Sequence, residues 1–86
     1  MTSWKVLLKA EMSSRGESEE DVVASTLTPQ QENRRFDAGY GGTEGCAFTV
    51  WTKTRVYFPA CYDGSEWVDS VSRNPDGVAT GHIGGG

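Results

Sequence analysis

The stretch AFTVWTKTRVYFPACYDGSEWVDSV, residues 47–71, decides the fold that we predict from the sequence. It holds two of the three tryptophans, two of the three tyrosines and two of the three phenylalanines in the chain. Its Asp63-Gly64 pair is typical of a two-residue β-hairpin turn, and Lys53-Thr54 is the second turn that we predict. The stretch therefore predicts a β-meander of three antiparallel strands.

These turns determine which residues lie opposite one another in the meander. Trp51 then opposes Val56, and Ala60 opposes Trp67. Because side chains alternate between the two faces of a sheet, most of the bulky rings gather on one face, which we expect to be the core face. This face carries Trp51, Val56, Phe58, Tyr62, Trp67 and Val71. The opposite face carries Phe48, Val50, Arg55, Tyr57, Pro59, Glu66 and Val68.

The second face is too apolar to lie in plain solvent. Either another helical segment or the C-terminal tail covers it, or it is a binding surface. Pro59 lies in the middle strand, where its missing N–H predicts a bulge or a strand with one open edge. The same register sets Cys46 opposite Cys61, and in a reducing cytoplasm we expect two free thiols there instead of a disulfide.

Residues 3–15 predict an amphipathic helix, with Ser3 as its N-cap and Gly16 at its C-terminal end. Its apolar stripe should cover the core face, and it consists of Trp4, Leu7, Leu8 and Met12. A strand over residues 4–11 is the alternative.

Two shorter elements follow this helix. Ser18 begins a stretch that fits a short helix or a short strand, ending near Leu27. The run Thr28-Pro29-Gln30-Gln31 combines an N-cap, a proline at the first helical position and a capping box. It predicts a helix that continues to Arg35 or Phe36.

The two remaining segments of the chain, residues 37–46 and 74–86, are rich in glycine. Four glycines predict a loop over residues 37–46, and five predict a flexible tail over residues 74–86. The 86 residues thus make one domain, residues 1–73, followed by the tail. The predicted class is α+β, with two or three short N-terminal helices packed on a three-stranded antiparallel β-meander.

Charge and composition narrow the classes of partner. The net charge of −4 disfavours nucleic acid, which selects basic surfaces. The N-terminus lacks a signal-peptide pattern and no stretch is long enough to cross a membrane, so we expect a cytoplasmic protein. A chain this short with 36% apolar residues is marginally stable, so a partner or self-association would add stability.

Reactive groups are few in the sequence. Two cysteines and one histidine are too few ligands for a standard zinc site, and we expect no metal or cofactor. Asp63 belongs to a turn, whereas Glu66 and Asp69 point to opposite faces of the predicted sheet, so no two carboxylates share a proton. We therefore expect a protein that is not an enzyme.

The segment FTVWTKTRVYFPACYDGSEWVDSVSRNP, residues 48–75, resembles a group of small uncharacterised proteins encoded in bacteriophage genomes. The resemblance includes FDAGYGGTEG before this segment and WKVLL from residue 4, so it extends over most of the chain. It implies a phage origin and expression in the bacterial cytoplasm, but no catalytic residue, because no activity is established for the group. By analogy of class, small phage proteins commonly bind a host protein, including proteins of host defence.

Our leading hypothesis is a non-enzymatic module that binds and modulates a host protein. Aromatic residues dominate interface energies, and the candidate contact residues are Tyr40, Phe48, Arg55, Tyr57 and Trp67.

Two alternatives remain open. A ubiquitin-like or sulfur-carrier protein would use the end Gly84-Gly85-Gly86, with strands over residues 4–11 and 21–27 before a helix over residues 29–36. A single-stranded nucleic-acid binder would use a basic and aromatic patch of Lys53, Arg55, Tyr57 and Arg73.

Overall fold

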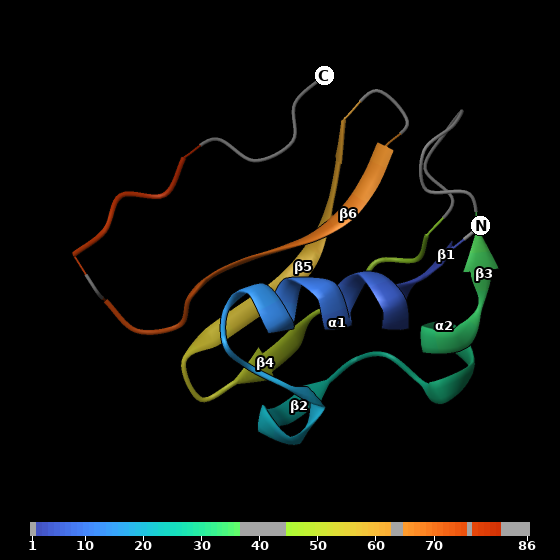
Figure 1. Ribbon diagram of the computed structural model, residues 1–86, viewed down its shortest axis with the longest axis horizontal. Helices are drawn as coiled ribbons and strands as arrows, with labels where there is room; N and C mark the ends of the chain where they lie inside the picture. Colours follow the sequence, from blue (N-terminus) through green and yellow to red (C-terminus); the bar gives the residue numbers. More distant parts are fainter. Residues whose placement is uncertain (1, 37–44, 63–64, 76, 82–86) are drawn as a thin grey trace.

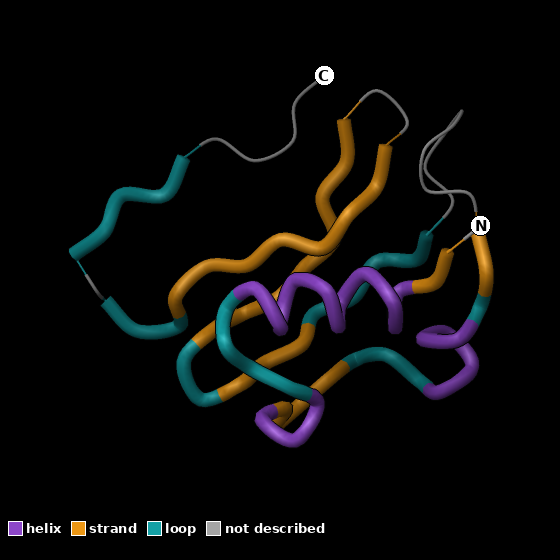
Figure 2. The backbone as a smooth tube through the Cα atoms, viewed as in Figure 1, coloured by secondary structure: helices purple, strands orange, loops and turns teal. Residues whose placement is uncertain are grey.

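The structure is a computed structural model, which describes residues 2–36, 45–62, 65–75 and 77–81. In these residues the elements are β1 (Thr2–Ser3), α1 (Trp4–Ser14), the 3₁₀ turn η1 (Glu19–Asp21), β2 (Val22–Ser25), α2 (Pro29–Asn33), β3 (Arg35–Phe36), β4 (Val50–Thr52), β5 (Arg55–Tyr62) and β6 (Ser65–Ser72). One antiparallel sheet has the order β2-β4-β5-β6, and β1 pairs with β3 in a second (Figures 1 and 2). The predicted α+β class is confirmed.

The first helix begins and ends where the sequence predicts. The Ser3 side chain accepts a hydrogen bond from the Val6 N–H at 3.4 Å, which caps the N-terminus of α1. Gly16 lies just past the other end with φ of 75°, a conformation that favours glycine. The alternative of a strand over residues 4–11 is therefore wrong.

The next two elements are partly as predicted. Ser18 and Asp21 form a capping box around η1, after which the chain extends as β2 and pairs with β4. The short-strand alternative thus holds for residues 22–25, and the sheet has four strands instead of the three that we predicted. Thr28 and Gln31 form the predicted capping box of α2.

The second helix is shorter than predicted, because α2 ends at Asn33. Phe36 belongs instead to β3, where it lies opposite Thr2 of β1. Its ring packs on Trp4 with 4.8 Å between the ring centroids, and Phe48 packs on Trp4 at 4.9 Å. These three rings close the end of the core beside the small sheet.

The predicted register is confirmed along the whole of β5 and β6, and between β4 and β5 at Trp51. Trp51 pairs with Val56, and Ala60 pairs with Trp67. The pairing of β4 with β5 goes no further than Tyr57, so beyond this residue β5 is paired on one side only. Pro59 lies in that part, which fits the predicted open edge, because its missing N–H is not required there.

The face that we predicted as the core is the wrong one. Helix α1 covers the opposite face of the sheet, as Figure 1 shows, where Val50, Tyr57 and Val68 are buried. The core cluster consists of Trp4, Leu8, Met12, Leu27, Phe36, Phe48, Val50, Tyr57 and Val68. The cover of this second face thus comes from α1, which we expected on the other face, and not from the second helical segment or the C-terminal tail.

Gly45 brings the chain against the buried edge of Trp4. The Gly45 N–H donates to Glu66 Oε1 at 2.9 Å, and the Trp4 indole N–H donates to the Cys46 carbonyl at 3.0 Å. A Cβ on Gly45 would lie 2.7 Å from Trp4 Cε2, and Trp4 is 1% exposed and unable to retreat.

We expect Gly45→Ala to lower the free energy of unfolding by about 1–3 kcal/mol, because it overpacks this contact. Urea denaturation followed by circular dichroism measures the effect. The matched control is Gly81→Ala, where a Cβ meets nothing within 4 Å, and a change within about 0.5 kcal/mol is expected. Equal denaturation midpoints for the two variants would contradict the close approach.

Candidate functional site

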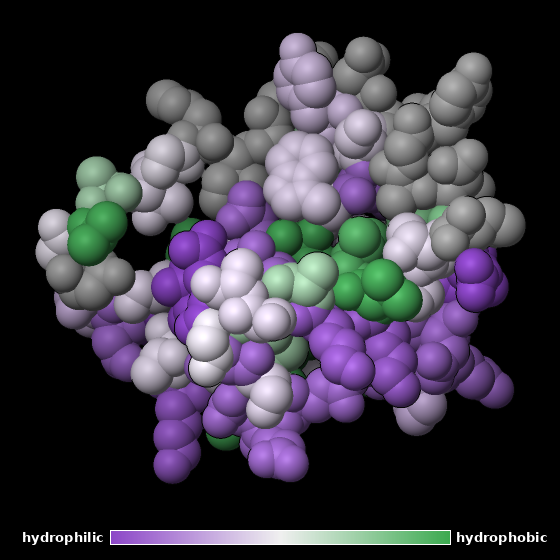
Figure 3. All heavy atoms as spheres, viewed as in Figure 1, coloured by the Kyte–Doolittle hydropathy of each residue, from purple (hydrophilic) through white to green (hydrophobic). Residues whose placement is uncertain are grey.

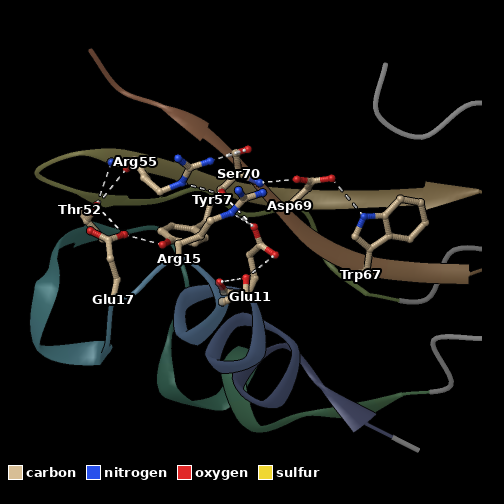
Figure 4. Close-up of polar contacts among 10 residues, drawn as sticks. Glu11, Arg15, Glu17, Thr52, Arg55, Tyr57, Trp67, Asp69 and Ser70 are labelled. Atoms are coloured by element: carbon tan, nitrogen blue, oxygen red, sulfur yellow. Dashed lines mark hydrogen bonds and ion pairs between the residues drawn. The ribbon is translucent and has the colours of Figure 1, made fainter. Parts of the chain in front are cut away.

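A carboxylate holds the covered face of the sheet to the segment after α1 (Figure 4). Glu17 accepts hydrogen bonds from the hydroxyls of Thr52 at 3.1 Å and Thr54 at 3.0 Å, and from the hydroxyl of Tyr57. Thr52 and Tyr57 are both 0% exposed. Burial of their hydroxyls is tolerated because Glu17 satisfies both of them.

A second group of polar contacts ties α1 to β6. Glu11 binds Arg15 one turn later at 2.8 Å and accepts a hydrogen bond from the Ser70 hydroxyl at 2.9 Å. Ser70 in turn accepts from Arg55 Nε at 2.9 Å. The hydrogen bond to Glu11 and the charge of Glu11 raise the pKa of Arg15. These contacts position α1 against β6. They also hold the Arg55 side chain in a hydrogen bond with Ser70.

The other face of the sheet carries the rings that we had predicted as core. We call it the open face, and it consists of Trp51, Val56, Phe58, Tyr62, Trp67 and Val71. Tyr62 is 55% exposed and the others are half-buried. None of the six belongs to the core cluster.

Asp69 lies opposite Phe58 in the register, so it belongs to the same face as the rings. The Trp67 indole N–H donates to Asp69 Oδ2 at 3.4 Å, and the Ser70 N–H donates to Oδ1 at 2.8 Å. Figure 4 shows the Trp67 ring directed toward this carboxylate. The open face thus combines large apolar side chains with one negative charge.

The structure corrects most of the predicted contact residues. Phe48 is 5% exposed and Tyr57 is 0% exposed, so neither is available to a partner. Arg55 is half-buried and bonded to Ser70. Trp67 is accessible, but on the face that we had assigned to the core. Tyr40 lies outside the described residues.

The alternation of side chains along the strands is a sequence signal for the open face, although it predicted this face as the core. The predicted alternation, which places Trp51, Phe58 and Trp67 on one side of the sheet, is confirmed. A dense group of rings is equally typical of a core and of an interface. Only the position of α1 distinguishes the two.

A polar groove of about 560 Å³ lies between the end of β6 and the C-terminal segment. In Figure 3 this region is the hollow between that segment and the body of the molecule. Arg15, Arg55, Arg73 and Asp69 line it. The groove joins two residues of the predicted basic and aromatic patch, but buried Tyr57 cannot stack on a base there.

We also searched for metal ligands, membrane-spanning helices and similar proteins. In the part of the chain that the structure describes, no three His, Cys, Asp or Glu side chains are grouped to hold a metal ion. No helix in that part is long and apolar enough to span a membrane. In comparisons with protein-family models, curated proteins and solved structures, nothing matches the chain.

Burial raises the pKa of the Tyr57 hydroxyl above its ordinary value of 10.0, and the hydrogen bond to Glu17 and the charge of Glu17 raise it further. Above about pH 10 the unfolded chain therefore loses this proton while the folded chain keeps it. The stabilisation is complete below the unfolded pKa and is lost as the pH rises toward the folded pKa.

Tyr57→Phe removes this titration, so we expect its free energy of unfolding to fall less steeply than that of the wild type from about pH 10 to 11. At neutral pH the variant should be less stable by about 1–2 kcal/mol, because it lacks the hydrogen bond to Glu17. Denaturant titrations across the pH range measure both effects. Tyr62→Phe, which removes a hydroxyl at an exposed position, should change the stability at neutral pH by no more than about 0.5 kcal/mol. A wild-type slope for Tyr57→Phe would contradict the role of its burial.

Proposed function

We propose that this chain is a small non-enzymatic module that binds a protein of the bacterial host through the open face of its sheet. The observation that carries the proposal is the group of rings on this face, outside the core cluster and across the sheet from α1. The resemblance to phage proteins agrees with a host protein as the partner, and a modulator or inhibitor of host defence is one such role. The proposal keeps our leading hypothesis and changes the contact surface.

Phe58 and Trp67 are the anchors that we expect to contribute most to binding. Tryptophan is among the residues enriched at the centres of interfaces, where burial of its large ring is most favourable. Both residues lie in regular β-strands, with Phe58 on β5 and Trp67 on β6. Because the strands already fix the backbone, binding orders little of the chain, and less free energy is lost on association.

Asp69 indicates the chemistry of the partner surface. It is the one charged residue on the open face within the strands β4, β5 and β6, and the chain as a whole has a net charge of −4. A complementary surface is apolar at its centre and carries an arginine or lysine near Asp69. The Trp67 indole already orients this carboxylate, so such a cation would meet a preorganised acceptor.

The two alternative functions have less support. A β-grasp start needs a strand where the chain forms α1, and residues 84–86 lie outside the described residues. A nucleic-acid binder needs stacking rings beside its basic groups, and Tyr57 is buried. Neither alternative gains an observation in its favour from the described residues.

The test begins with a partner isolated from bacterial host lysate by the immobilised protein, and then measures dissociation constants with the purified partner. We expect Phe58→Ser and Trp67→Ser each to weaken binding by about 30-fold or more, which corresponds to the loss of a hot spot of about 2 kcal/mol. Asp69→Asn should reduce the dependence of affinity on salt. Circular dichroism confirms that each variant is folded.

Val6→Ser is the matched control, because Val6 is 59% exposed on α1 and lies away from the open face. It should bind as the wild type does. The proposal fails if this control weakens binding as much as Phe58→Ser, or if both ring variants bind normally. A protein that forms dimers by sedimentation, and loses them in Phe58→Ser, would assign the face to a second copy of the chain.

A further inference from the structure

The register of the sheet directs Cys46 toward Cys61. Val50 pairs with Tyr57 in the ladder between β4 and β5. Four residues back from Val50 is Cys46, and four residues on from Tyr57 is Cys61. An antiparallel ladder continued in this register would thus set the two cysteines directly opposite one another.

The ladder stops short of them and leaves a small cavity. A pocket of about 180 Å³ lies between residues 45–47 on one side and residues 59–61 on the other, so both cysteines line it. Pro59 explains the gap, because a proline has no N–H to donate to a continued ladder. Neither cysteine is part of a disulfide, and Cys46 is half-buried whereas Cys61 is exposed.

Glu66 holds the two sides of this pocket near one another. It lies opposite Cys61 in the ladder between β5 and β6, and its carboxylate accepts the Gly45 N–H at 2.9 Å. Cys46 is the next residue, and its carbonyl accepts the Trp4 indole N–H at 3.0 Å. Trp4 and Glu66 are 1% and 5% exposed. Two buried side chains therefore fix the backbone at Cys46 beside the strand that carries Cys61.

We propose that Cys46 and Cys61 form a dithiol site that low-molecular-weight disulfides of the glutathione class oxidise to an intramolecular disulfide. The exposed Cys61 thiolate attacks one sulfur of the oxidant, forms a mixed disulfide and releases one thiol. The Cys46 thiolate then attacks the sulfur of Cys61, forms the protein disulfide and releases the second thiol. The two protein thiols lose two electrons and two protons, and the oxidant is reduced to two thiols.

This site has a consequence for the open face. The disulfide requires a short cross-strand distance, so its formation draws the segment before β4 onto β5 and closes the pocket. The end of β5 that it fixes also carries Tyr62, one residue beyond Cys61. The proposal does not rest on the proposed function, because it concerns the two thiols and the pocket between them.

The test is the equilibrium between the dithiol and the disulfide in glutathione buffers, measured by mass spectrometry after acid quenching. It is done with the folded wild-type chain and with the same chain unfolded in guanidinium chloride. We expect the equilibrium constant for disulfide formation to be at least tenfold larger in the folded chain, because the fold holds the thiols together. A smaller ratio would overturn the proposal, because the fold would then favour the disulfide little more than random contact of the two thiols in an unfolded chain does.

Linkage provides a second measurement of the same quantity. A tenfold ratio corresponds to about 1.4 kcal/mol, so the unfolding free energy of the oxidised chain should exceed that of the reduced chain by at least this amount.

Cys46→Ser and Cys61→Ser are the matched controls, since each leaves one thiol. Both variants should stop at a mixed disulfide with one glutathione, whereas the wild type should release it and end lighter than its reduced form by two hydrogen atoms. Wild-type protein that accumulates two glutathiones, or that forms disulfide-linked dimers instead, would overturn the proposal.

Discussion

The carboxylate of Glu17 is the constraint on which the rest of the structure depends. It accepts hydrogen bonds from hydroxyls on β4, on β5 and in the turn between them. Gly16, with φ of 75°, reverses the chain directly after α1 and brings Glu17 over the sheet. The helix is therefore tied to one particular face. On the other face, Thr52 and Tyr57 would have had no such acceptor for their buried hydroxyls.

The choice of face has a direct consequence for the surface of the molecule. Helix α1 covers the face with Val50, Tyr57 and Val68, together with the polar side chains of Thr52 and Ser70. The rings of Trp51, Phe58, Tyr62 and Trp67 are left on the open face, where they are half-buried or exposed. The surface that we propose for binding thus consists of the rings that the core does not use.

The predictions that held are those that rest on local physics. Ser3, Thr28 and Gln31 cap their helices because a side-chain oxygen meets a free N–H within a few residues. The register of the hairpins follows from the spacing of the turns, and it was correct at Trp51 and at Ala60. The predictions that failed needed distant partners. Phe48 and Tyr57 were predicted as exposed contact residues. The structure buries them, because Phe48 packs on Trp4 and Tyr57 donates to Glu17.

By itself, the sequence determined the α+β class, the capped start of each helix and the pairing of β5 with β6, because each depends on residues close together in the chain. The tertiary structure alone decided which face of the sheet is covered. The two faces differ little in apolar character, so hydrophobicity gives no clear preference between them. What separates them is whether buried hydroxyls such as that of Tyr57 find acceptors, and Glu17 lies 40 residues away in the sequence.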